Sequence, residues 1–477
     1  MKIACEYHSH RHFSGFVFSV LFLPFLAGAC LQAAVVFPDM VVQSGAWLDP
    51  SIWMDETPPD GESMTILNRF DVTLFSGDEA KTGLLLVGET SNATVSLQNA
   101  TLTTGLTSLG VSANVSGQAH LNGGTWTNSG PLTIGEAGSG SLVLTNQGTL
   151  TAPSVVLAVE NGSNGELRFG TGGEPGTILT DSITTGSGSA VVNFDHSSSL
   201  ALNSTLKGNL SVNQSGLGIT ILAQDCSYTG ATVISSGTLL IAGNCSSSPL
   251  DIREGATVGT GSDSILSSVL STGGFLCPGG SGERNSIGSL TVTQNLQLCN
   301  SAVLSMELGG HTAGTLYDQI SCSTGATITL SQAQLHLSFV NSFQPTNFLA
   351  PQEPERFFIV VGSTTPITGT FSNFADSHPD LPGFSTTTIN GQTWAISYTG
   401  QWNKGVNSSL TGGNDIVVFA IPEPKLGSLL ASAIFAAFFF TSRWSVSARC
   451  RRFSSISYPM SGQRDVTPQG MNWHSRP

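Results

Sequence analysis

The chain has 477 residues, 55 of them glycine, with only 10% charged residues and a formal net charge of −14. Residues 35–421 contain 28 acidic and 8 basic residues, whereas both ends of the chain are basic. A nucleic-acid-binding protein needs clustered Lys and Arg to displace phosphate counterions, so we expect no nucleic-acid partner. A hydrophobic content of 39% is enough to build a core and argues against intrinsic disorder.

Segment 1–34 is typical of an export signal. Basic residues precede the apolar run 15–26, which is too short to cross a bilayer comfortably. Small residues follow, so we expect signal peptidase to cut after Ala29 or after Ala34. Cys30 leaves a lipoprotein signal as an alternative. The chain is therefore predicted to leave the cytoplasm through Sec-type export machinery.

Four consecutive segments between positions 84 and 176 resemble one another, and each contains a short alternating strand bracketed by Gly, Asn and Ser. No α-helical period is found between positions 35 and 420. Aligned apolar positions recur about every 24 residues, and they are Leu97, Leu121, Leu144 and Phe169. Short strands at this spacing predict stacked coils, a parallel β-solenoid. A string of β-sandwiches is the alternative, but it does not predict such a repeat.

Beyond position 180 the repeat changes character. Segments 228–233 (YTGATV) and 236–241 (SGTLLI) resemble the autotransporter-associated β-strand repeat, and 207–212 and 218–222 resemble its lead-in. Further segments are similar to the regions flanking this repeat in autotransporter-like surface proteins: 45–47, 49–53, 276–281, 288–292, 305–310, 317–320, 369–374 and 413–418. The resemblance implies a β-solenoid architecture for most of the exported protein.

The C-terminal region combines a Pro-Glu-Pro tripeptide, an apolar segment at 426–446 and a cluster of arginines. The apolar segment is long enough for a marginal membrane span, with the arginines on the cytoplasmic side. This order resembles the PEP-CTERM sorting signal, which implies cleavage near the tripeptide by an exosortase-like membrane protease. The tail after Phe453 departs from that pattern, and a plain membrane anchor is the alternative. The residues of the predicted signal are Pro422, Glu423, Pro424, Arg449, Arg451 and Arg452.

Five cysteines lie in the predicted exported region, and the last three are almost equally spaced along the chain. This spacing, close to one coil, would allow the three to stack on one face of successive coils. Export permits disulfides, but we interpret the cysteines as small buried side chains in an inward ladder. No C-x-x-C pair occurs, so zinc and thioredoxin-like redox chemistry are not expected. The five are Cys226, Cys245, Cys277, Cys299 and Cys322.

Acidic pairs and histidines are the candidate catalytic groups, because glycosidases need two carboxylates across a cleft. The pairs lie among turn residues without a neighbouring Arg or His, so we interpret them as solvated turns; they are Asp55/Glu56, Asp78/Glu79 and Glu353/Glu355. The histidines are scattered, at positions 120, 196, 311, 336 and 378. We predict no catalytic, cofactor-binding or metal-binding residue.

Two further groups could serve binding. Trp126, Trp394 and Trp402, if exposed, could stack on sugar rings, or they could fill the corners of the coils. The segment 412–417 looks like half of a calcium-binding nonapeptide, but one copy cannot complete a site. We interpret it as a turn.

We therefore expect an all-β chain, an elongated parallel β-helix or β-solenoid with an N-terminal signal helix and a C-terminal transmembrane helix. The predicted segments are 1–34 signal peptide, 35–75 N-terminal cap strands, 76–178 β-solenoid repeats, 179–329 autotransporter-associated repeat region, 330–420 C-terminal β-rich cap, 421–453 sorting signal and 454–477 disordered tail. The expected function is that of a non-enzymatic surface or extracellular-matrix protein, an adhesin or spacer. It would be anchored transiently in the inner membrane, then reach the cell surface, outer membrane or medium and contact extracellular polysaccharide. The alternative is a carbohydrate-binding or polysaccharide-degrading β-helix protein.

Overall fold

The computed structural model describes residues 38–61, 63–279, 286–344, 355–379, 381–404 and 408–421. These ranges are almost entirely β-structure, with one short 3-10 helix, η1 (Pro50–Ile52). Within them, no helix is long and apolar enough to span a membrane. The predicted signal helix and C-terminal helix both lie outside the described ranges.

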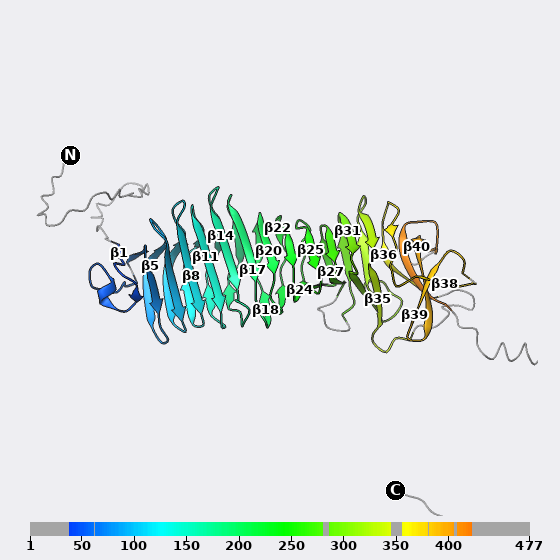
Figure 1. Ribbon diagram of the computed structural model, residues 1–477, viewed down its shortest axis with the longest axis horizontal. Coiled ribbons are helices and arrows are strands. Elements are labelled where there is room, and N and C mark those ends of the chain that lie inside the picture. Colours follow the sequence, from blue (N-terminus) through cyan, green and yellow to red (C-terminus); the bar gives the residue numbers. More distant parts are fainter. Residues whose placement is uncertain are drawn as a thin grey trace, which may run out of the picture. The chain divides into compact units, whose positions relative to one another are not determined.

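The strands stack as successive coils of a parallel β-solenoid, which confirms the predicted fold class (Figure 1). The longest sheet, called the second wall here, has 14 strands and runs the length of the stack. Its strands are β2 (Gly45–Ala46), β4 (Asp71–Leu74), β6 (Ala93–Gln98), β8 (Ser116–Asn122), β11 (Ser139–Thr145), β14 (Asn164–Phe169), β17 (Ser189–Phe194), β20 (Leu210–Gln214), β23 (Thr232–Ile234), β25 (Leu250–Arg253), β28 (Val269–Thr272), β31 (Asn295–Cys299), β34 (Thr327–Ser331) and β37 (Thr368–Gly369).

The first wall begins as a 12-stranded sheet. Its main path is β1 (Asp39–Met40), β3 (Met64–Leu67), β5 (Glu79–Val87), β7 (Thr101–Leu109), β10 (Leu132–Ile134), β13 (Val155–Leu157), β16 (Ser182–Thr185), β19 (Thr205–Gly208) and β22 (Ser227–Tyr228). Three more strands branch from the start of β7: β9 (Thr125–Asn128), β12 (Thr149–Thr151) and β15 (Thr177–Leu179).

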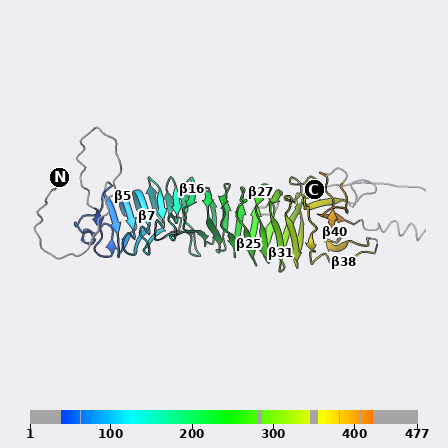
Figure 2. The same cartoon turned by 90° about the horizontal axis from the view of Figure 1, so that it is seen from above.

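The first wall continues in an 8-stranded sheet whose parallel strands are β27 (Asp263–Leu266), β30 (Ser289–Val292), β33 (Gln319–Cys322) and β36 (Arg356–Val361). Antiparallel strands then follow β36 in the order β41 (Asp415–Ala420), β40 (Gln392–Gly400), β39 (Ser385–Ile389) and β38 (Asp376–Ser377). The third wall has seven strands: β18 (Ser199–Leu202), β21 (Ile219–Leu222), β24 (Thr238–Ile241), β26 (Thr257–Thr260), β29 (Phe275–Cys277), β32 (Val303–Leu308) and β35 (Gln334–Phe339). Figure 2 shows the same order of coils from above.

The strand register confirms the aligned repeat positions. In the second wall Leu97 pairs with Leu121, Leu121 with Leu144, and Leu144 with Phe169. Phe194 continues this column on β17, and its ring stacks on that of Phe169 at 5.2 Å with an interplanar angle of 12°. All five side chains are fully buried. The alternating pattern therefore gives each coil an inward apolar row, and stacking joins the rows into one core.

Glycine is required at three successive positions of one column of this wall. Gly117, Gly140 and Gly165 occupy these positions, whereas Ala93 before them and Ala190 after them stand in the same column. A Cβ atom on Gly140 would lie 2.1 Å from the backbone nitrogen of Gly135, and one on Gly117 would lie 2.0 Å from the Val87 carbonyl oxygen. Both distances are shorter than any real carbon contact, so the corner leaves no room for a side chain in these coils.

Aromatic side chains fill the two ends of the stack. At the N-terminal end Trp47 and Trp53 pack edge to face at 5.3 Å, and the indole N–H of Trp53 donates to the Trp47 carbonyl at 2.8 Å. At the other end Trp394 of β40 packs on Phe339 and Phe357. Antiparallel strands and large rings thus cover edges that would otherwise offer unpaired backbone groups.

Candidate functional site

Two of the three candidate sugar-stacking tryptophans are buried, which agrees with the alternative that they fill the corners of the coils. Trp126 and Trp394 have no exposed surface, and the Trp126 indole N–H donates to the Thr104 hydroxyl at 3.0 Å. Trp402 is half-buried and packs against the small cluster of Phe358, Val361 and Val417. Trp126 and Trp394 therefore present no open ring face to a ligand.

The three equally spaced cysteines do not stack on one face. Cys277 lies on β29 of the third wall, Cys299 on β31 of the second wall, and Cys322 on β33 of the first wall. The coils lengthen here, because Leu296 pairs with Val269 before it and with Ile328 after it. Successive paired positions are therefore farther apart in sequence than successive cysteines. Each cysteine therefore lies one wall earlier in its coil than the preceding cysteine does.

Most of the acidic pairs serve turns, as predicted. The Asp55 carboxylate accepts from the Thr57 amide at 3.2 Å, and that of Asp78 accepts from the Phe75 amide at 2.7 Å. Glu355 contradicts the prediction, because its side chain is fully buried and its Oε1 lies 3.0 Å from Nε2 of His311. Glu353 lies outside the described residues.

The half-nonapeptide also forms a structural turn. The two Asp415 carboxylate oxygens accept from the Gly362 amide at 2.9 Å and the Trp402 amide at 2.7 Å. Burial raises the pKa of this carboxyl group. Across the described ranges, no group of three or more His, Cys, Asp or Glu is placed to hold a metal ion.

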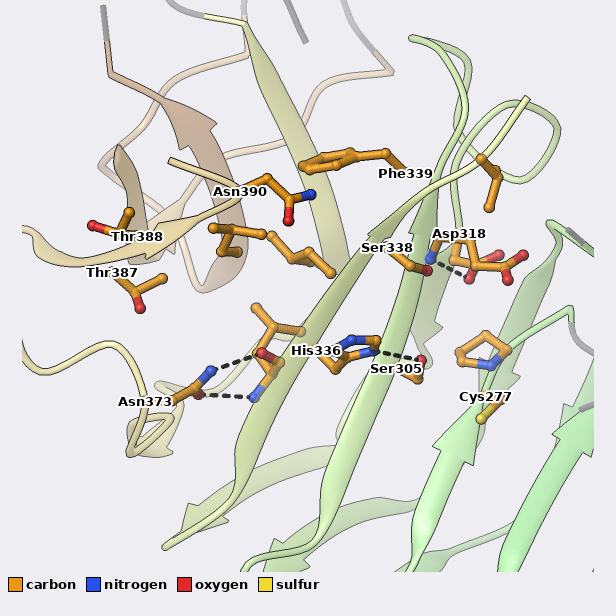
Figure 3. A pocket seen from close by; sticks show the side chains of 16 residues that line it. Cys277, Ser305, Asp318, His336, Ser338, Phe339, Asn373, Thr387, Thr388 and Asn390 are labelled. Carbon is orange, nitrogen blue, oxygen red and sulfur yellow. Dashed lines mark hydrogen bonds between the residues drawn. The ribbon is translucent and has the colours of Figure 1, made fainter. Parts of the chain in front are cut away.

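A groove of about 630 Å³ lies at the C-terminal end of the third wall (Figure 3). Strands β29, β32 and β35 form its floor, and the strand β39 with Asn390 lies opposite. Asn373 forms part of the rim, since its side-chain amide exchanges two hydrogen bonds with the backbone of Leu335, at 3.0 and 2.8 Å. This amide extends the edge of β35 in the way that another strand would.

Four titratable side chains line this groove: Cys277, Glu307, Asp318 and His336. His336 is exposed, and its Nδ1 lies 3.4 Å from the hydroxyl of Ser305 on the neighbouring strand. That distance is longer than the 2.6–3.2 Å expected for a nucleophile and its base. Asp318 is 1% exposed and its carboxylate accepts from the amides of Gly288 at 2.9 Å and Glu307 at 2.7 Å. The groove therefore offers hydrogen-bond donors and acceptors for binding, without an assembled nucleophile.

Burial is the main cause that raises the pKa of Asp318 to about 8, against the two backbone N–H groups that favour its ionised form. Burial likewise raises the pKa of the Cys277 thiol at the groove to about 11. Neither of these two groups is therefore charged at mildly acidic pH. No pattern in the sequence marks this groove beyond the isolated His336, because its lining residues meet there only after the coils have stacked.

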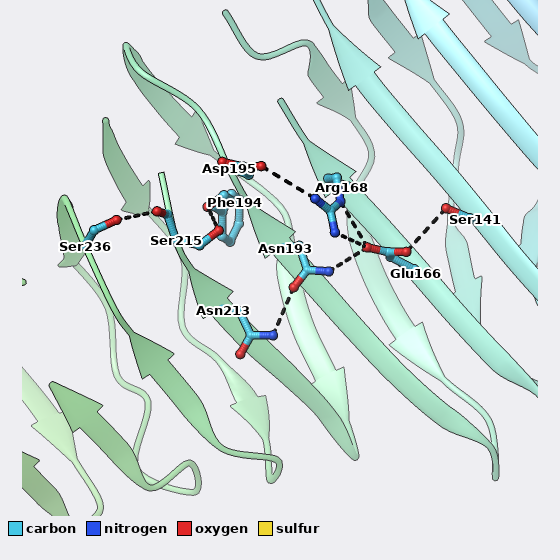
Figure 4. Close-up of polar contacts among 9 residues, drawn as sticks. All are labelled: Ser141, Glu166, Arg168, Asn193, Phe194, Asp195, Asn213, Ser215 and Ser236. Atoms are coloured by element: carbon cyan, nitrogen blue, oxygen red, sulfur yellow. Dashed lines mark hydrogen bonds and ion pairs between the residues drawn. The ribbon is translucent and has the colours of Figure 1, made fainter. Parts of the chain in front are cut away.

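The outer face of the second wall carries a ladder of polar side chains (Figure 4). Glu166 lies at the centre of this ladder. Its carboxylate accepts a hydrogen bond from Nδ2 of Asn193 at 2.7 Å and forms an ion pair with the Arg168 guanidinium at 3.0 Å. Arg168 also approaches Asp195 at 3.5 Å, and Asn213 donates to Asn193 at 2.9 Å. These contacts link successive coils on the solvent side. Arg168, the cation of this group, is paired with two carboxylates.

A second ladder consists of hydroxyl groups. Thr101, Thr125, Thr149 and Thr177 occupy one register position on β7, β9, β12 and β15. The hydroxyls of Thr101 and Thr125 lie 3.4 Å apart, and those of Thr149 and Thr177 lie 3.3 Å apart. Three of the four side chains are exposed and Thr149 is half-buried. This threonine ladder is a regular row of uncharged hydroxyl groups, with Glu79 at the same register position one coil before it.

The predicted processing residues lie outside the described ranges: Ala29, Ala34, Pro422, Glu423, Pro424, Arg449, Arg451 and Arg452. Their roles stay predictions.

Comparison with known proteins gives one partial similarity. The chain is 35% identical over 118 residues to "Adhesin BmaC autotransporter" of Brucella suis biovar 1 (strain 1330). The match covers 23% of this chain and 3% of that protein, so the chain spans a small fraction of its relative's length. No family model matches the chain, and no solved structure matches it significantly. The fold and this distant similarity together are consistent with autotransporter-associated repeats in an exported or surface protein.

Proposed function

We propose that the chain is a non-enzymatic surface or extracellular-matrix protein, a β-solenoid adhesin or spacer. The observation that carries this proposal is the threonine ladder, a regular row of uncharged hydroxyl groups on a stack of coils. The partial identity to a protein named as an autotransporter adhesin supports it. A rigid stack places many weak, identical contacts in one plane, and their simultaneous engagement multiplies a weak affinity. An extracellular polysaccharide, with its repeated hydroxyl groups, is the partner we propose for this surface.

The route to the surface is part of the same proposal. Sec-type export machinery and signal peptidase would remove the N-terminal segment after Ala29 or Ala34. The C-terminal apolar segment would hold the chain in the inner membrane until an exosortase-like protease cuts near Glu423, with Arg449, Arg451 and Arg452 on the cytoplasmic side. The protein would then reside at the cell surface or in the medium.

Attachment of cells tests the adhesive role. The host strain lacking this chain is complemented with the full chain or with Thr101→Val, Thr125→Val and Thr149→Val combined, which removes hydroxyls while keeping side-chain shape. We expect several-fold fewer cells to bind polysaccharide-coated surfaces with the triple variant. Thr94→Val, on an outward position of β6, is the matched control and should attach like the parent. Equal attachment by the deletion strain and the complemented strain would refute the adhesive role.

Intact-mass analysis of the membrane, surface and medium fractions tests the sorting route. Loss of both termini in the surface or medium fraction is the expected result, and Glu423→Ala should leave an uncut C-terminus in the membrane. Asp465→Ala in the tail serves as the control and should be processed normally. An uncut parental chain confined to the membrane would contradict exosortase sorting and leave a plain anchored protein.

A carbohydrate-binding groove is the second candidate function, and the recess beside His336 favours it. Its rim residues Asn373, Thr387 and Asn390 supply amide and hydroxyl groups of the kind that orient sugars. We expect Asn390→Ala and His336→Ala to weaken binding of soluble oligosaccharides to the full chain at least tenfold, while His120→Ala on the second wall leaves it unchanged. Release of reducing ends from polysaccharide by the parent, abolished by His336→Ala, would instead indicate a degrading enzyme.

A further inference from the structure

The first wall has a seam between its two sheets. The 12-stranded sheet ends at β22, and the 8-stranded sheet begins at β27. The coil between β22 and β27 forms no strand in this wall. Its residues Asn244 and Cys245 lie at the corresponding position. Cys245 forms an isolated parallel bridge with Leu266 of β27. This position has the thinnest backbone ladder of the described first wall.

Hydrogen bonds nevertheless keep the coils in register across the seam. The Cys226 amide donates to the Asn244 carbonyl at 2.7 Å, and the Cys245 amide donates to the Ile265 carbonyl at 2.8 Å. Side-chain oxygens accept the next two backbone hydrogen bonds in place of backbone carbonyls. The Asn244 backbone N–H donates to Oδ1 of Asp225 at 2.8 Å, and the Ile265 backbone N–H donates to Oδ1 of Asn244 at 3.1 Å. Cys226 and Cys245 therefore occupy adjacent coils at a regular strand separation of about 4.8 Å.

The two thiols meet inside the core. Cys226 is 7% exposed and Cys245 is 2% exposed, and the two thiols lie close enough for each to shift the pKa of the other. A strand separation of about 4.8 Å lies within the 4.4–6.8 Å range of Cα separations that a disulfide spans. The other three cysteines of the described chain lie on three different walls, so this is the pair that stacking brings together.

We propose that Cys226 and Cys245 form a disulfide in the exported protein and that this bond closes the seam. The proposal rests on the export proposed above, because the cytoplasm keeps thiols reduced. Thiol–disulfide exchange supplies the chemistry. The Cys226 thiolate attacks the disulfide of an exported thiol oxidoreductase or of glutathione, and the Cys245 thiolate then displaces that partner. Two S–H bonds are lost and one S–S bond forms, while the oxidant disulfide takes two electrons and two protons and becomes two thiols.

The surroundings of the two thiols determine which one attacks the oxidant disulfide and which one then displaces the partner. Contact with Cys245 lowers the pKa of the Cys226 thiol, whereas the same contact and burial raise that of Cys245 well above its ordinary range. The thiolate is the nucleophile in this exchange, so Cys226 attacks first. The bond would close a loop of a single coil, and a loop of that length lowers the equilibrium population of the open state by roughly 100-fold in the chain-entropy description.

The first experiment is oxidation of the purified full chain by a buffer of oxidised and reduced glutathione. It is followed by alkylation in denaturant and peptide mapping. We expect one crosslinked peptide pair joining Cys226 to Cys245. Cys299→Ser, the matched control, should keep this crosslink, and Cys226→Ala should leave Cys245 fully alkylated. Absence of the crosslink in a parental chain that retains its β-sheet circular dichroism would overturn the proposal.

Mapping the protein from the surface or medium fraction separates this proposal from the proposed export. The crosslink in that fraction supports both. A chain found in the cytoplasm with reduced thiols, which nevertheless crosslinks in glutathione buffer, would contradict export and support the pairing. An exported chain with both thiols free would contradict the disulfide alone. Hydrogen exchange gives an independent readout, since reduction should speed exchange about 100-fold in β22 and β27 and leave β4 unchanged.

Discussion

Replacing Phe194 by Ala tests whether the coils are coupled mainly to their neighbours. Phe194 is fully buried on β17, and its ring stacks on Phe169 of the preceding coil at 5.2 Å. Removing a buried phenylalanine side chain costs about 3–5 kcal/mol, and the lost ring pair accounts for about 0.5–1.5 kcal/mol of coupling. A cost of this size corresponds to a roughly 100- to 4,000-fold faster exchange of amide hydrogens that open with the affected coils.

Hydrogen exchange with mass spectrometry on the full chain resolves where the stability is lost. Because each coil contacts only its neighbours, acceleration should be greatest in β14, β17 and β20 and should fade toward β4 and β34. Val191→Ala, on the outward side of β17, should change exchange by less than about threefold, as surface substitutions do. Equal acceleration in every coil would refute nearest-neighbour coupling, and no acceleration anywhere would refute the burial of the ring.

Three more predictions concern single residues. Gly140→Ala should destabilise the stack far more than Gly173→Ala, because a Cβ at Gly140 meets backbone at 2.1 Å whereas one at Gly173 meets open space; thermal unfolding of both variants compares them. The free energy of unfolding should fall as pH rises from about 4 to 8. The pKa of Asp318 is about 8 in the folded chain against an ordinary 3.8, so over this range the unfolded chain loses the proton that the folded chain keeps. Asp318→Asn should flatten this pH dependence in urea titrations at several pH values. Arg168→Leu should cost less than about 1 kcal/mol, since its ion pairs are partly exposed, and a larger loss of unfolding free energy at high salt would contradict that reasoning.

The regular part of the fold could be predicted because each coil repeats the same local pattern. Alternation and bracketing turn residues place Leu97, Leu121, Leu144 and Phe169 in one column, and the register agrees at every step. The same alternation could have placed Trp126, since it stands between two threonines that point outward and therefore points inward itself.

The cysteine positions and the groove could not be obtained in this way. Residues that are equally spaced in sequence occupy the same place on successive coils only if every coil has the same number of residues. Beyond Val269 the coils contain more residues. The Cys226–Cys245 contact arises where the spacing does match the local coil. The groove depends on β39, which belongs to an antiparallel group outside the repeat. The pairing of that group is set by long-range contacts and leaves no periodic mark in the sequence.

The uneven coil length has a consequence for how such a chain can change over generations. Paired positions in the second wall lie closest in sequence from Thr232 to Leu250, and farthest apart from Thr329 to Thr368. The strands stay aligned in both cases, so the difference is taken up at the corners. Insertions and deletions there alter the loops without shifting an inward column, whereas a single-residue insertion within a strand would turn that column to solvent. Corners are thus open to variation in length, and strands are restricted to substitution.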